Sequence, residues 1–75
     1  MGKLPQVSGK DIGRVLVRLH FELKSQRGSH MKFVRKHQYG REVVIVPNHK
    51  TIRAGTLHDI LKQLNLTAEK LMELL

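Results

Sequence analysis

The sequence predicts an α+β fold in the order α-β-β-β-α, followed by a short additional helix. Three observations predict it. Apolar residues repeat with a helical period near both ends of the chain, they alternate with polar residues in the middle, and glycine-containing segments separate the alternating stretches. At 75 residues the chain can form one small domain with a thin core. We therefore expect a single domain over residues 1–75, with residues 1–7 as a flexible lead-in.

The first helix is predicted to begin after Ser8. A serine side chain can accept a hydrogen bond from a free amide of the first turn, and Asp11 three residues later suits the positive end of a helix. Gly13 lowers the helix propensity, which suggests that another element packs closely against it. The stripe that should face the core consists of Ile12, Val15, Leu16 and Leu19.

Three strands are predicted to follow as an antiparallel meander. The first begins at Phe21, the second begins at His30 after a turn at Gly28, and the third covers residues 43–46 and ends at Pro47. The segment 39–41 is the second turn. Period-two alternation places Phe21, Leu23 and Ser25 on one face of the first strand, and Met31 and Phe33 on one face of the second, opposite His30, Lys32 and Val34.

A second amphipathic helix is predicted to begin at Thr56, with Asp59 as the matching capping residue. Asn65 suits a left-handed C-terminus, and Thr67 should start the short last helix. Each main helix has one apolar stripe, so both should cover the same face of the sheet. The opposite face is left to solvent or to RNA. The apolar stripe of this helix consists of Leu57, Ile60, Leu61 and Leu64.

The positive charge is concentrated in the middle of the chain. The net charge is +8, and no acidic residue occurs between Glu22 and Glu42. This pattern favours a polyanionic partner, and nucleic acid more than the other candidates. Few aromatic residues accompany the cations, which argues against a stacking platform for single strands. The cations of this acid-free stretch are Lys24, Arg27, Lys32, Arg35, Lys36 and Arg41.

His30 is the main candidate for a catalytic residue. A turn glycine fixes its position, basic residues surround it, and it should lie on the open face of the sheet. An imidazole exchanges protons near neutral pH, and RNA carries its own nucleophile in the ribose 2′-OH. The alternative is an ordinary exposed histidine. His49 is a secondary candidate for proton transfer or phosphate contact, although an ordinary loop histidine is the alternative there too.

The candidates for phosphate contact are Lys24, Arg27, Lys32 and Arg35. We expect no metal site and no cofactor, because the chain has no cysteine and no histidine pair at helical ligand spacing. No apolar run is long enough to cross a membrane, and the absence of cysteine fits the cytoplasm.

Three motifs in order resemble HicA toxins. They are Gly28-Ser29-His30, residues 46–49 (Val-Pro-Asn-His), and residues 52–57 leading into 60–63, and the resemblance extends from about Ser8 to Leu66. It implies a fold similar to a double-stranded-RNA-binding domain. It also implies an mRNA interferase of a type II toxin–antitoxin system, which cleaves RNA without a known metal requirement and thereby inhibits translation and growth. The family's catalytic histidine corresponds to His30.

The resemblance also implies a partner, a HicB-type antitoxin that covers this histidine in a hetero-oligomer. One departure is visible, because family members often have glycine where this chain has residues 19–21 (Leu-His-Phe). The function expected from the sequence is therefore an endoribonuclease toxin that acts on mRNA. A non-catalytic RNA-binding module is the alternative, and a small basic subunit of a larger protein assembly is a third possibility.

Overall fold

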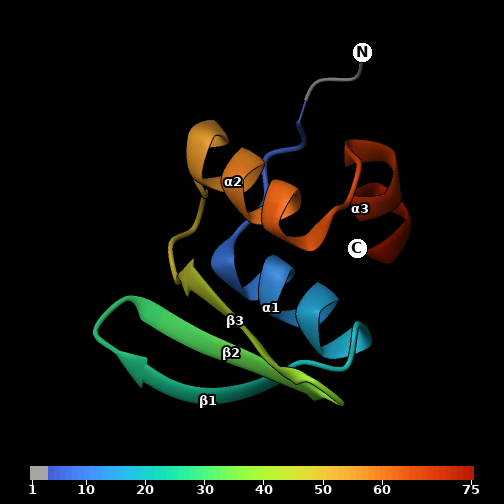
Figure 1. The fold of residues 1–75 in the computed structure, drawn as a ribbon. Helices are drawn as coiled ribbons and strands as arrows, with labels where there is room; N and C mark the ends of the chain where they lie inside the picture. The colour runs from blue at the N-terminus through green and yellow to red at the C-terminus, as the bar shows by residue number, and fades with distance from the viewer. Residues whose placement is uncertain (1–3) are drawn as a thin grey trace.

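The structure, a computed structural model, describes residues 4–75. Its three strands form one antiparallel sheet in the order β1-β2-β3, and all three helices lie on one side of it (Figure 1). The predicted α+β order is confirmed, including the extra helix and the placement of both main helices on one face. The elements are α1 (Gly9–Arg18), β1 (Glu22–Arg27), β2 (His30–His37), β3 (Gly40–Pro47), α2 (Ala54–Leu64) and α3 (Ala68–Leu74).

Helix α1 begins with the predicted capping box. The Asp11 amide donates to Ser8 Oγ over 3.0 Å, and the Ser8 amide donates to Asp11 Oδ2 over 3.0 Å. The backbone hydrogen bond from Ser8 is the main reason why the pKa of Asp11 is lowered from its ordinary value. The Ser8 hydroxyl and the positive charge of Arg14 lower this pKa further.

Helix α1 ends in a Schellman motif that has histidine where glycine is usual. The Phe21 amide donates to the Leu16 carbonyl over 2.9 Å, and the His20 amide donates to the Val17 carbonyl over 3.0 Å. His20 adopts a φ of 72°, in the left-handed region that favours glycine. The position where the sequence departs from the resembled family is therefore one where the backbone favours glycine.

Met31 and Phe33 of β2 face the helices, as predicted. They pair with Val46 and Val44 of β3, and all four side chains belong to the core. Val34 points to the other side of the sheet. It is only 3% exposed but lies outside the core cluster.

Strand β1 departs from the predicted alternation. Leu23 pairs with Phe33, whereas Ser25 pairs with Lys32, so the register shifts by one residue at a β-bulge. Directly paired residues project from the same face of a sheet. Ser25 therefore lies on the open face, and its predicted placement beside Phe21 and Leu23 is wrong.

Helix α2 begins earlier than predicted. Arg53 is its N-cap, and no side chain caps this end, so Thr56 is an internal residue of the first turn and not the cap. Ile52 is buried, and its amide donates to the Val7 carbonyl over 2.8 Å. These contacts fix the loop before α2 and thereby the residue at which the helix begins. The other predicted ends are confirmed, with Asn65 in the left-handed conformation and Thr67 capping α3.

The segment before α1 contributes to the core. Val7 is 4% exposed, and Leu4 packs against the core cluster. The expected flexible lead-in is therefore wrong for Val7, and residues 1–3 of that lead-in lie outside the described residues. Gly13 lies under the Phe33 ring, where an added Cβ would come within 3.1 Å of Phe33 Cζ, as its low helix propensity suggested.

Candidate nucleic-acid interface around His30

His30 is exposed at the first position of β2, directly after the hairpin turn Gly28-Ser29. Gly28 has a φ of 55°, a conformation that is readily available only to glycine, so the turn position is fixed by this residue. The turn pairs His30 with Arg27 across β1, while Pro47 pairs with His30 from β3. Because paired residues share a face, Arg27, His30 and Pro47 all project from the open side of the sheet.

Two backbone hydrogen bonds hold the loop after β3, one to the turn before β2 and one to the first residue of α1. The Asn48 amide donates to the Ser29 carbonyl over 2.6 Å, and the Gly9 amide donates to the His49 carbonyl over 2.8 Å. A Cβ on Gly9 would overlap the Pro47 carbonyl oxygen, so only glycine allows α1 to approach this closely. The N-terminus of α1 thus positions the loop that bears His49.

Two hollows meet at His30 and Ile45 on the open face. The first extends toward the loop and the start of α2, with a volume of about 490 Å³, and the second extends toward β1, with a volume of about 260 Å³. Neither lining contains an acidic residue, so cations dominate the local field. The first hollow is lined by His30, Ile45, Pro47, His49, Thr51, Arg53 and Thr56, and the second by Ser25, Arg27, His30, Lys32 and Ile45.

The structure brings together four of the six residues singled out from the sequence. His30 and His49 line the first hollow, and Arg27 and Lys32 line the second with His30. Lys24 is exposed in the bulged part of β1, where its Nζ lies 3.4 Å from the carboxylate of Glu22.

Arg35 does not join this group. Its Nη2 donates to Glu42 Oε1 over 2.8 Å, its Nη1 donates to the Leu19 carbonyl over 2.9 Å, and its guanidinium lies 4.6 Å from the centroid of the Phe21 ring. These partners hold Arg35 on the helix side of the sheet, opposite His30. This placement separates Arg35 from the predicted group around His30, and its charge is already used in structural contacts.

Sequence reasoning missed Arg53 and Thr51 as residues of the site. Both come from the loop that leads into α2, and both line the hollow that contains His30 and His49. Arg53 had one available signal, its position in the motif of residues 52–57. Nothing in the sequence indicated that the cap position of α2 would turn toward the start of β2.

Within residues 4–75, no three side chains of the His, Cys, Asp or Glu type lie close enough together to hold a metal ion. No helix in the described part of the chain is long and apolar enough to cross a membrane.

Comparison with known proteins identifies the family. No curated protein and no solved structure resembles the chain closely enough to count as a match. Residues 9–66, from the first residue of α1 to a point beyond the end of α2, match a protein family described as the HicA toxin of bacterial toxin–antitoxin systems. This match includes both hollows of the open face. The chain therefore belongs to the HicA family of toxins from bacterial toxin–antitoxin systems.

Proposed function

We propose that the toxin is a metal-independent endoribonuclease that acts on mRNA and uses His30 for proton transfer. The observation that carries the proposal is the position of His30, exposed where two acid-free hollows meet on the open sheet face. An RNA strand along this face would reach the cations of β1 and β2 on one side of His30 and those of the loop on the other. Cleavage of mRNA would stop translation and growth, which accounts for toxicity.

The reaction needs only groups that this face and the RNA supply. The imidazole of His30 removes the proton from a ribose 2′-OH, and the oxygen attacks the adjacent phosphorus. The 5′ oxygen of the next nucleotide leaves and takes a proton. The products are a 2′,3′-cyclic phosphate and a 5′-hydroxyl end, so atoms and protons balance without water or metal in this step. General acid–base catalysis of this kind contributes about 10²–10⁴-fold.

Cations stabilise the extra negative charge that develops on the phosphorus during attack. Arg27 and Lys32 border the hollow on one side of His30, and Arg53 borders the hollow on the other. We assign these three side chains to phosphate contact, with Lys24 as an outer contact. His49 lines the same hollow as His30 and is our candidate for protonating the leaving oxygen.

The test compares the parent protein with His30→Ala on a defined RNA, in the presence of excess EDTA. We expect the parent to cleave despite chelation, with products ending in a cyclic phosphate by mass spectrometry. His30→Ala should lose at least about 10²-fold in rate. Its unfolding free energy should change by less than about 1 kcal/mol, because His30 is exposed and fills no core space. RNA affinity should persist, since the cations remain.

The matched control is His58→Ala, which removes an exposed histidine from α2 and should leave cleavage unchanged. Activity that disappears with EDTA and returns with magnesium would refute the metal-independent mechanism. A parent protein that binds RNA but never cleaves it would instead support the non-catalytic RNA-binding module.

A further inference from the structure

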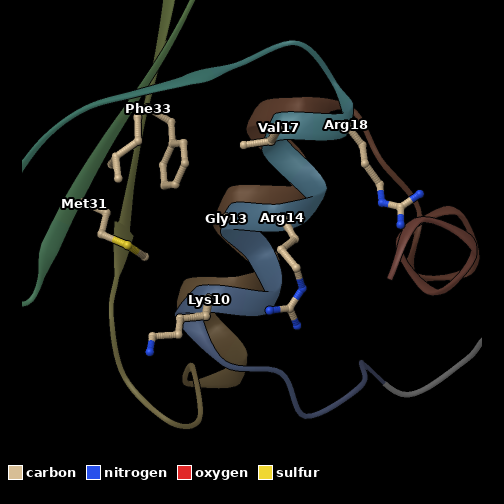
Figure 2. A pocket seen from close by; sticks show the side chains of 8 residues that line it. Lys10, Gly13, Arg14, Val17, Arg18, Met31 and Phe33 are labelled. Atoms are coloured by element: carbon tan, nitrogen blue, oxygen red, sulfur yellow. The ribbon is translucent and has the colours of Figure 1, made fainter.

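An open groove runs between α1 and the β1–β2 part of the sheet, on the side away from His30. Its volume is about 640 Å³, and Figure 2 shows Val17 projecting from α1 on the side that faces Met31 and Phe33 of β2. None of the proposed RNA contacts lines it. The groove is lined by Lys10, Gly13, Arg14, Val17, Arg18, Leu23, Met31 and Phe33.

The floor and walls of this groove are apolar and partly open to solvent. Val17 is 59% exposed and Leu23 is 50% exposed, while Met31 and Phe33 below them belong to the core. Gly13 contributes no side chain to the wall, so the ring of Phe33 forms the surface there. Val17 and Leu23 thus leave apolar surface open to solvent beside the hollow, where a binding partner could cover it.

The rim of the groove is cationic. Lys10, Arg14 and Arg18 follow one another at intervals of four residues, so they lie on successive turns of α1 (Figure 2). Asp11 pairs with Arg14 and neutralises part of this charge. Among residues 4–75, Lys10 and Arg18 form no ion pair. No acidic side chain lines the groove itself.

We propose that this groove is a second docking site on the toxin, for an acidic, amphipathic segment of the cognate antitoxin distinct from the part expected to cover His30. The apolar floor would take aliphatic side chains from one face of that segment, and carboxylates beside them would meet the three cations of the rim. The proposal rests on membership of the toxin family, which implies an antitoxin as partner, and not on the ribonuclease mechanism.

Charge and polarity favour an antitoxin segment as the occupant of the groove over RNA and over a second copy of this chain. The cations of the rim could contact RNA phosphates, but the floor formed by Val17, Leu23 and Phe33 offers no side-chain hydrogen-bonding group to the bases. A second copy of this chain would bring a net charge of +8 against a cationic rim. An acidic protein segment satisfies both the floor and the rim.

The test measures by calorimetry the affinity of the toxin for its antitoxin, after the two proteins have been purified together, separated and refolded. Val17→Glu places a carboxylate in the apolar wall and should weaken binding by about 10- to 100-fold, as at other interface anchors. Met72→Glu is the matched control, because Met72 is also 59% exposed on a helix but lies on α3, outside the groove. We expect it to change the affinity by less than about threefold.

Two charge-reversal variants test the contribution of the cationic rim separately from that of the apolar floor. Arg18→Glu should weaken binding and reduce its dependence on salt, whereas Lys62→Glu, an exposed lysine of α2, should do neither. Methyl resonances of Val17, Leu23 and Met31 in the parent toxin provide a readout that needs no variant. They should shift when the antitoxin is added.

The proposal is overturned if folded Val17→Glu binds the antitoxin as tightly as the parent and the three methyl groups do not shift. It is also overturned if an RNA oligonucleotide shifts them while the antitoxin does not. Self-association in sedimentation experiments that Val17→Glu abolishes, without any effect on antitoxin binding, would assign the groove to a second copy. RNA cleavage is not read in any of these experiments, so failure of the ribonuclease mechanism leaves them unaffected.

Discussion

Gly9 connects the fold to the candidate site, and replacing it with alanine should destabilise the protein. The added Cβ would overlap the Pro47 carbonyl oxygen and lie 2.7 Å from the Cα of Asn48. Both are backbone atoms, so no side-chain rotation relieves the contact and the loop has to move. Overpacking of this kind costs about 1–3 kcal/mol, which exceeds the roughly 1 kcal/mol or less that alanine adds to helix propensity.

The assay is thermal unfolding followed by circular dichroism, together with RNA cleavage at a temperature where both proteins are folded. In a domain of this size 1 kcal/mol corresponds to a shift in Tm of roughly 4–8 °C, so Gly9→Ala should lower Tm by roughly 5–15 °C. Cleavage should fall as well, because the displaced loop carries His49.

Gly55→Ala is the matched control for this substitution. Gly55 lies in the first turn of α2, and a Cβ there would meet nothing within 4 Å. Alanine should therefore raise Tm by a few degrees through helix propensity alone. A Gly9→Ala protein that is as stable as the parent would refute the close approach of α1 to the loop after β3.

Two further predictions concern the ends of α1. His20→Gly should stabilise the protein by about 1 kcal/mol, because it removes a side chain from a left-handed residue. His20→Ala should not, and equal Tm values for the two variants would contradict the reasoning. The pKa of Asp11 is lowered in the folded protein, so its contribution to stability is present above the pKa of the unfolded chain and is lost as the pH falls through the folded pKa. Asp11→Asn should therefore flatten the fall in Tm between about pH 6 and pH 2, and an unchanged slope would show that the capping box contributes nothing.

The helix ends that local chemistry determines could be predicted from the sequence. Ser8, Asn65 and Thr67 each act on backbone groups within a few residues, and the structure confirms all three. The start of α2 could not be predicted, because the distant carbonyl of Val7 holds Ile52 and sets where the helix begins. The side chain of Thr56 is better suited to capping a helix than that of Arg53. The hydrogen bond between Ile52 and Val7, more than forty residues apart in sequence, nevertheless determines where α2 begins.

The residues of the candidate site also divide into those whose position follows from local features and those whose position depends on tertiary contacts. The exposed position of His30 at the start of β2 could be predicted because the turn at Gly28 is a local feature. The inclusion of Arg53 and the exclusion of Arg35 depend on tertiary contacts, since Arg53 reaches the site through the loop after β3 and Arg35 is held by Leu19 and Glu42. Charge in the sequence identified a cationic segment but not which face each cation would occupy.

The bulge in β1 shows why face assignments failed where the alternation looked regular. The turn at residues 28–29 pairs Arg27 with His30, and unbroken alternation from there would place Leu23 and Phe21 on the same open face. Phe21 is 2% exposed in the core on the other side. The tight turn and the burial of Phe21 are thus incompatible with a regular strand, and one extra residue between Leu23 and Ser25 reconciles them. The bulge therefore allows Arg27 to project from the open face beside His30 while Phe21 remains in the core.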